Sequence, residues 1–232
     1  MPDKTAIVLG ASGSVGQALL TTLVQSAAFT RIIVLARKPL SVQAGIDVRL
    51  VPRMEPVELE QAVIAALSES QEVIGFSVLG VGAGTAKLTL EEHRAVDVEL
   101  NAAFARGLKA SDKVRHLCFM SSMGANINAR TTGSGAAGMA RYSRVKGEAE
   151  AAVTAQGPAV VSIFRPAVII GSQHTPKLLA AIIPLFTFLT PARFRSIRTT
   201  EIAQAMLVSA LRPPVESAIY AYPEMMALIG RT

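Results

Sequence analysis

The sequence contains little of what several common functions require. Cys118 is its only cysteine, so no internal disulfide can form and a reducing compartment is expected. Aromatic residues make up 5% and charged residues 17% of the chain, while half of the residues are hydrophobic. This balance predicts a globular protein with a large core and excludes a disordered chain. Because Cys118 lies in an apolar run, its thiol is expected to be inert.

Metal and nucleic-acid sites have no support either. The three histidines, His93, His116 and His174, are scattered and lack metal-ligand spacing, so no metal site is predicted. The formal net charge is +6, and positive charge can attract nucleic acids or phosphorylated ligands. No recognition motif or series of aromatic residues accompanies this charge, so the expected partner is a small-molecule substrate and not a nucleic acid.

Long hydrophobic runs are also absent. The most apolar stretch, residues 178–189, is too short to span a bilayer and contains Pro184, so no integral membrane association is predicted. It is expected to wall a substrate pocket or to form a homodimer contact, with peripheral membrane contact as the alternative. The first residues lead into a strand without the pattern of a signal peptide, and the predicted location is cytoplasmic.

Short apolar runs alternate with amphipathic segments, which is typical of βαβ units. Because the apolar runs are continuous, they indicate parallel strands that are buried on both faces. The sequence therefore predicts an α/β fold, a Rossmann-type doubly wound parallel sheet, in a single domain 1–232 whose residues 171–232 form a small substrate-side portion. The predicted strands are 5–9, 31–36, 46–51, 73–79, 114–120, 159–164 and 217–221. The predicted helices are 15–27, 56–67, 91–109, 140–155, 177–189 and 200–211.

A glycine-rich loop connects the first predicted strand and helix. Gly10 permits a tight turn, Gly13 lets the backbone approach a pyrophosphate, and Gly16 allows the helix to pack closely on the strand. The free N–H groups at the helix start favour a phosphate. A glycine-rich turn without a ligand is the alternative. The candidate cofactor contacts in this loop are Gly10, Ser12, Gly13, Ser14, Val15 and Gly16.

The ends of two further strands complete the predicted nucleotide site. An acid after the second strand would favour NAD, whereas this chain has Arg37 and Lys38 there. Arg37 can bind a 2′-phosphate with help from Lys38, so NADP is favoured over NAD; a solvated basic turn is the alternative. The glycine-rich segment 79–84, which begins with Leu79 and Gly80, is expected to pass close to the cofactor, although it could be only a loop.

Tyr142 and Lys146 are four residues apart in a predicted helix, so both side chains project from one face. A nearby ammonium lowers the pKa of a phenol, which suits a tyrosine that donates or accepts a proton. Ser121 and Ser122 follow a predicted strand, where a hydroxyl can hold a substrate oxygen. The order of glycine loop, serines, tyrosine and lysine favours catalysis over an ordinary exposed helix.

These motifs resemble those of the short-chain dehydrogenase/reductase superfamily, in its atypical or extended branch, and are most similar to TIP30-like oxidoreductases. The resemblance covers nearly the whole chain. Its motifs are GASGSVG at 10–16, LGVGAG at 79–84, SSMGA at 121–125, YSRVKGE at 142–148 and FRP at 164–166.

The resemblance implies a nicotinamide cofactor and a catalytic group of Ser122, Tyr142 and Lys146. Tyr142 would be the acid/base, Lys146 would bind the nicotinamide ribose, and Ser122, in preference to Ser121, would orient the carbonyl. Pro166 would border the nicotinamide.

Several positions depart from the family pattern. Residues 51–54 carry no acid where relatives often have one near the adenine, and Ala167 replaces a glycine. The helix 91–109 has Asp97 where relatives often supply an asparagine. Asn101, one turn later, is the nearest amide, with an ordinary surface role as an equal alternative.

Charged residues near the motifs have structural interpretations. Glu148 and Glu150, beyond the lysine, are expected to face solvent. Arg165 is expected either to contact cofactor or substrate or to form a salt bridge.

Two functions are consistent with the whole sequence. The first is an NADP-dependent oxidoreductase that transfers a hydride between nicotinamide and a small or medium-sized carbonyl or alcohol. The second is a catalytically weak NAD(P)H-binding regulatory or scaffold protein, because a fold does not determine a function. The presence of Ser122, Tyr142 and Lys146 together favours the enzyme.

Overall fold

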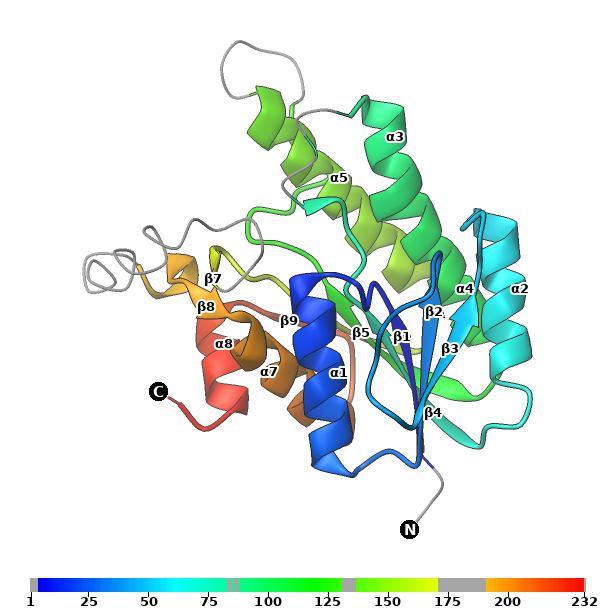
Figure 1. Ribbon diagram of the computed structural model, residues 1–232. Coiled ribbons are helices and arrows are strands. Elements are labelled where there is room, and N and C mark those ends of the chain that lie inside the picture. Colours follow the sequence, from blue (N-terminus) through cyan, green and yellow to red (C-terminus); the bar gives the residue numbers. More distant parts are fainter. Residues whose placement is uncertain (1–3, 83–84, 86–87, 131–136, 171–190, 232) are drawn as a thin grey trace.

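A seven-stranded parallel sheet forms the centre of the computed structural model, which describes residues 4–82, 85, 88–130, 137–170 and 191–231 (Figure 1). The strand order is β3-β2-β1-β4-β5-β6-β9. The order reverses between β1 and β4, and ligands of such sheets bind outside the carboxyl ends of the strands at this point. The strands are β1 (Lys4–Leu9), β2 (Arg31–Ala36), β3 (Ile46–Leu50), β4 (Glu72–Ser77), β5 (Val114–Met120), β6 (Val160–Phe164) and β9 (Ala218–Tyr220).

Helices cover both faces of the sheet, so the predicted fold class is confirmed. One layer holds α1 (Ser14–Ser26), α7 (Thr199–Leu211) and α8 (Tyr222–Leu228), with α7 packed against both others. The opposite layer holds α2 (Pro56–Ala66), α4 (Asn101–Ala110) and α5 (Ala137–Gln156), with α4 packed between the other two. Two apolar cores result, one on each face, and strand residues alternate between them, as Ala6 and Ile7 do.

The prediction of one continuous helix over residues 91–109 is wrong in the middle of that range. The chain forms α3 (Leu90–Arg94), then the π-helix η2 (Ala95–Leu100), then α4. The Asn101 side chain donates to the Asp97 carbonyl at 2.9 Å, so it satisfies a backbone acceptor within the widened turn. π-turns inside helices are frequent at functional sites, and hydrophobic periodicity does not reveal them.

The C-terminal part contains short elements that the sequence pattern did not predict. Strands β7 (Ile169–Ile170) and β8 (Ile197–Arg198) form a separate parallel pair, and a 3-10 turn, η4, covers Ala192–Phe194. Helix α8 was also missed, although Pro223 in its first turn and the hydrogen bond from the Ala221 N–H to the Glu224 carboxylate support its start. Two-residue strands are too short to show a period. The predicted helix 177–189 lies outside the described residues.

Other differences are small. Helix α5 begins at Ala137, inside the predicted loop 131–138. Cys118 is fully buried in the core, as its apolar run predicted, and burial raises the pKa of its thiol. In the described part of the chain, no helix has the length and apolar character needed to cross a membrane.

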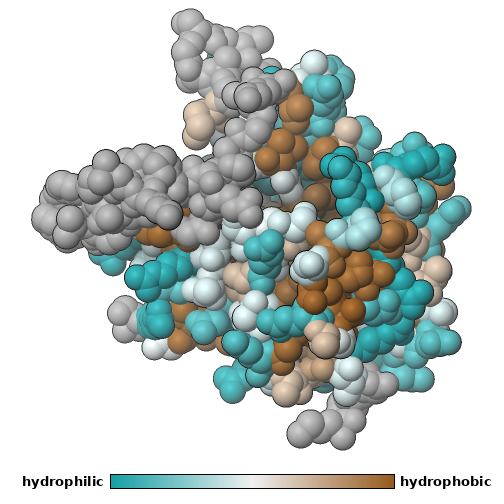
Figure 2. Space-filling model, viewed as in Figure 1, coloured by the Kyte–Doolittle hydropathy of each residue, from teal (hydrophilic) through white to brown (hydrophobic). Residues whose placement is uncertain are grey.

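The connection between β2 and β3 covers the sheet where no helix does. Leu40, Ile46 and Val48 are only partly buried there, against the core on the α1 side. Figure 2 shows hydrophobic residues at the surface in the part of the molecule where Figure 1 draws β2 and β3. Hydrophobic side chains at this edge of the sheet are therefore partly exposed to solvent.

Candidate active site

The glycine loop brings three backbone segments into close contact. Gly10 has a φ of +89°, and a Cβ there would lie 2.5 Å from the backbone nitrogen of Leu79. A Cβ on Gly16 would lie 2.3 Å from the Gly10 carbonyl oxygen. Both positions therefore require glycine, for the turn and for close helix packing as predicted. No atom lies nearer than 3.7 Å to a Cβ built on Gly13, so this residue leaves space in front of the loop.

A cavity of about 680 Å³ opens beside this loop, at the carboxyl ends of β1 and β2. Five predicted cofactor residues line it: Gly10, Ser12, Arg37, Lys38 and Leu79. Arg53, Met54, Glu55 and Glu99 also line it, and none of these was predicted. The stretch 51–54 therefore borders the cavity although it lacks the expected acid.

The remaining loop residues lie outside the cavity lining. Val15 and Gly16 are buried, and the Val15 side chain belongs to the core beside α1. Gly13 and Ser14 lie at the N-terminal end of α1, where the helix dipole favours an anion.

The serine pair follows β5 at the same edge of the sheet. Ser121 is 3% exposed, and the Oγ atoms of Ser121 and Ser122 are both buried without a hydrogen-bond partner in the described structure. The Ser121 N–H donates to the Phe164 carbonyl at 2.8 Å, and the Met123 N–H donates to the Pro166 carbonyl at 2.9 Å. These bonds fix the end of β5 beside Pro166, which is buried. Two unpaired buried hydroxyls are available to a ligand.

The segment after β5 lies directly against α5. The Asn126 N–H donates to the Ser143 carbonyl at 2.8 Å. A Cβ on Gly147 would lie 2.2 Å from the Ile127 backbone nitrogen, so glycine is needed at this contact. The two contacts are one residue beyond Tyr142 and one beyond Lys146, and they hold this part of the helix against the segment that carries the serines.

Lys146 is the most strongly constrained side chain of the site. It is 4% exposed, and its Nζ lies 2.5 Å from Oδ1 of Asp97, which is fully buried. The same Nζ lies 5.7 Å from the centre of the Tyr142 ring. Burial alone would lower the pKa of Lys146, but the attraction to Asp97, with smaller contributions from Tyr142 and Glu150, holds it above its usual value. Lys146 is therefore an ammonium at neutral pH.

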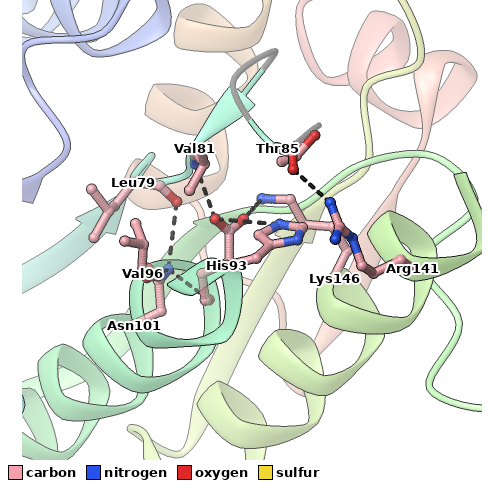
Figure 3. A network of polar contacts seen from close by, with 9 residues as sticks. Leu79, Val81, Thr85, His93, Val96, Asn101, Arg141 and Lys146 are labelled. Carbon is pink, nitrogen blue, oxygen red and sulfur yellow. Dashed lines mark hydrogen bonds and ion pairs between the residues drawn. The ribbon is translucent and has the colours of Figure 1, made fainter. Parts of the chain in front are cut away.

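The Asp97 carboxylate also binds the segment after β4. Its Oδ2 accepts a hydrogen bond from the Val81 N–H at 3.0 Å and lies 3.7 Å from Nε2 of His93 (Figure 3). A Cβ on Gly80 would lie 3.0 Å from the Lys146 Nζ and 3.2 Å from Asp97 Oδ1. Gly80 thus allows the backbone to pass close to the ion pair.

His93 joins this group, although scattered histidines predicted no site. Its ring is fully buried and stacks on Tyr142, with 5.9 Å between ring centres. Burial, followed by the fields of Lys146 and Arg141, lowers the pKa of His93 against the opposing effect of Asp97. The imidazole is therefore neutral at neutral pH. The spacing of four residues between His93 and Asp97 in a predicted helix was an available signal.

Asn101 is not a surface residue. It is 1% exposed and receives a short hydrogen bond, 2.5 Å, from the hydroxyl of Ser77 at the end of β4. Its amide contacts backbone carbonyls of the π-turn and of Leu79, at 2.9 to 3.5 Å. Asn101 therefore holds the strand end and the π-turn together.

The expectation that Glu148 and Glu150 face solvent is wrong. Glu150 is 7% exposed and pairs with Arg165 on both carboxylate oxygens, so the salt-bridge interpretation of Arg165 is confirmed. Glu148 accepts hydrogen bonds from Arg94 and Arg144, and these two guanidinium groups hold its pKa below the usual range. The buried Glu150 and the partly buried Glu148 are thus both held in salt bridges on α5.

Apart from Gly13, Ser14, Val15 and Gly16, the predicted residues divide into two groups. The cavity group comprises Gly10, Ser12, Arg37, Lys38 and Leu79. The second group, outside the cavity lining, comprises Gly80, Ser121, Ser122, Tyr142, Lys146 and Pro166. In this group Lys146 lies close to both Tyr142 and Gly80. In the described part of the chain, no three His, Cys, Asp or Glu side chains are grouped as metal ligands would be.

Comparison with known proteins assigns this geometry to a family. The model of the NAD(P)H-binding family matches residues 10–208, which include the glycine loop, the cavity cations, the serines, Tyr142 and Lys146. The chain belongs to the NAD(P)H-binding family.

The chain shares moderate sequence identity with two fungal proteins. A protein of Eremothecium gossypii named "Protein FMP52, mitochondrial" is 29% identical over 173 residues, which cover 73% of this chain and 68% of that protein. The protein of the same name from Candida glabrata is 27% identical over 177 residues, which cover 75% and 67%.

Solved dehydrogenase structures share the fold. The aldohexose dehydrogenase of Thermoplasma acidophilum superposes with a TM-score of 0.69 at 14% identity, covering 97% of this chain and 95% of that one. A short-chain dehydrogenase/reductase of Serratia marcescens gives 0.68 at 18% identity, with 97% and 98% covered. A short-chain dehydrogenase of Burkholderia cenocepacia in complex with NADP gives 0.60 at 16% identity, with 99% and 94% covered. At these identities the likeness establishes the Rossmann fold alone.

Proposed function

We propose that this NAD(P)H-binding protein is an NADP-dependent oxidoreductase acting on a small or medium-sized carbonyl or alcohol. The observation that carries the proposal is the placement of a charged, buried Lys146 beside the Tyr142 ring, 5.7 Å from ammonium to ring centre. When bound, the nicotinamide cofactor donates or accepts the hydride. The protein must then supply the proton and hold the substrate oxygen.

The residues present fit such a cofactor. The close approach of Gly10 to Leu79 leaves a loop that only glycine permits, next to an open cavity. The residues that would hold the nucleotide are the glycine loop with Ser12, the strand-end residues Leu79 and Gly80, and Pro166 with Ser121 near the nicotinamide end. Lys146 would bind ribose hydroxyls there.

Each catalytic side chain has a role that its surroundings support. Tyr142 would give a proton to the substrate oxygen during reduction, or take it during oxidation. Lys146 would stabilise the phenolate electrostatically. Ser122 would donate a hydrogen bond to the same oxygen, because its hydroxyl is buried and has no protein partner in the described structure.

The preference for NADP rests on charge in the cavity. Arg37 and Lys38 are exposed, line the cavity and have no carboxylate partner among the described residues. Both are therefore available for a 2′-phosphate. Arg53 lines the same cavity and adds a third positive group, although its guanidinium also lies 3.8 Å from Glu58.

Several finer assignments belong to the same proposal. We expect a TIP30-like branch of the short-chain dehydrogenases/reductases, a substrate-side portion after residue 171, and an apolar substrate wall or homodimer contact in residues 178–189, which lie outside the described residues. The proposed location is the cytoplasm. The two fungal relatives are named as mitochondrial proteins, and a fluorescent fusion of the full chain would decide between the two locations.

The test is a cofactor titration followed by a substrate screen. The protein should bind NADPH more tightly than NADH and should consume NADPH with some aldehydes, ketones or quinones. Tyr142→Phe should cut consumption by on the order of a hundredfold or more and keep binding. Tight NADPH binding without turnover on any of these substrates would instead support the regulatory or scaffold alternative.

A further inference from the structure

The ion pair between Lys146 and Asp97 is unusual because both partners are buried. Lys146 is 4% and Asp97 0% exposed. Removing one partner of a buried pair leaves an uncompensated charge, which is strongly unfavourable. A lysine alone in such surroundings loses its proton at a pH several units below the usual value. The charge state of Lys146 thus depends on Asp97.

Asp97 is held in place from three sides. Its Oδ1 faces the Lys146 ammonium at 2.5 Å from α5, and its Oδ2 accepts the Val81 N–H at 3.0 Å from the segment after β4. Asn101, one turn later, bonds the Asp97 carbonyl at 2.9 Å. The π-turn η2 carries Asp97 itself. A carboxylate fixed in this way cannot follow the lysine if the lysine moves.

The other charged and titratable groups around the pair do not replace Asp97. His93 lies 3.7 Å from Asp97 but is neutral at neutral pH, for the reasons given above. Arg141, which faces His93, donates instead to the carbonyls of Thr85 and Leu88. Tyr142 and Glu150 act on Lys146 at longer range, and Glu150 is paired with Arg165. Asp97 is the acid in direct contact with the lysine in the described structure.

We propose that Asp97 is a positioning residue that keeps Lys146 charged and fixed against the segment 79–82 before any cofactor binds. The catalytic role of Lys146 rests on the proposed function, whereas the protonation of its side chain does not. The asparagine that relatives often place here carries no charge and could not serve as a counter-ion. Gly80 belongs to the same arrangement, because a larger residue would meet both members of the pair.

The direct test is the titration of Lys146 in the protein without cofactor. Lysine labelled with ¹³C at Cε gives one NMR signal per residue, and the Lys146 signal is assigned by its loss in Lys146→Arg. In the wild-type protein, Lys146 should titrate above the usual lysine value of about 10.4. In Asp97→Asn, which removes the charge and keeps the shape, the signal should titrate at least about 2 pH units lower than in the wild type.

Glu91→Gln is the matched control, because Glu91 is an exposed acid six residues before Asp97 on the same helical stretch. It should leave the Lys146 titration unchanged. Equal Lys146 titration in Asp97→Asn and the wild type would overturn the proposal. If Asp97→Asn does not fold, the wild-type protein still decides the matter, since a Lys146 that titrates at or below the usual lysine value of about 10.4 would overturn the proposal as well.

Cofactor binding provides a second readout. In Asp97→Asn, NADPH affinity should fall as the pH rises past the lowered pKa of Lys146, whereas wild-type affinity should stay level over the same range. A parallel pH profile in both proteins would count against the positioning role. A protein that shows the Lys146 shift but never turns over a substrate would contradict the proposed function and leave the role of Asp97 intact.

Discussion

The two ends of the candidate site treat charge in opposite ways. Beside β2, Arg37 and Lys38 are exposed and have no carboxylate partner among the described residues. Beside α5, Lys146 is buried and lies against the buried Asp97. An exposed cation stays hydrated and can bind a charged ligand, whereas a buried cation requires a counter-ion from the protein itself. The open end therefore depends on the ligand for its partners, and the closed end is organised in advance.

The largest effect is expected at the closed end. Tyr142→Phe removes the phenol that moves the proton and should reduce turnover by on the order of a hundredfold or more. Folding and NADPH binding should be preserved, because the ring can still stack on His93. Steady-state rates and NADPH titration measure the two quantities. Tyr222→Phe, on α8, is the control, and undiminished turnover in Tyr142→Phe would remove this residue from the mechanism.

A buried histidine outside the site, His116, gives a second measure of what burial does to a titratable group. His116 on β5 is 4% exposed, and burial lowers its pKa to about 4. The folded protein thus binds this proton less readily than the unfolded chain, whose histidine pKa is about 6.5. The contribution of His116 to the free energy of unfolding is fully present above about pH 6.5 and is lost as the pH falls toward 4. The loss between about pH 7 and pH 5 should be roughly 2 kcal/mol.

Urea unfolding at the two pH values measures this loss. His116→Gln keeps a polar group for Ser162, which lies 2.9 Å from the ring nitrogen, but removes the titration. The variant should therefore show a smaller drop in the free energy of unfolding between the two pH values than the wild type. An identical drop in both proteins would show that His116 does not control it.

A smaller effect is expected at the open end. Arg37→Ala removes one cation from the cavity and should weaken NADPH binding by roughly tenfold, since a charged contact to phosphate contributes one to a few kcal/mol. NADH, which lacks the 2′-phosphate, should be almost unaffected. Arg115→Ala, an exposed arginine near the amino end of β5, is the control. Equal losses for both cofactors would contradict the assignment of Arg37 to the 2′-phosphate.

The smallest effect concerns salt. Because Arg37 and Lys38 are exposed, added salt should screen their attraction to a phosphate. Raising the ionic strength should weaken NADPH binding by a few-fold more than NADH binding, as measured by titration of each cofactor. The difference should shrink in Arg37→Ala. A constant ratio of the two affinities in the wild-type protein would argue that these cations do not contact the phosphate.

Local patterns predicted most of the fold. Buried parallel strands are continuous apolar runs, so strands β2 and β5 were predicted at their observed bounds, and the other five main strands within one or two residues. The glycines of the first loop were recognised because a turn and a close approach require them. The π-turn and the pair β7–β8 were missed, because each is stabilised by contacts between distant parts of the chain.

The sequence by itself determined the fold class and the NAD(P)-binding character, and it predicted a candidate site, because these depend on periodicity and on motifs of neighbouring residues. It also identified Tyr142 and Lys146, which share one helix. Only the tertiary structure decided which charges are buried and paired. Asp97 and Lys146 are 49 residues apart in sequence and meet because η2 packs against α5. Burial and ion pairing depend on such distant contacts, and the sequence pattern around Asp97 gave no measure of them.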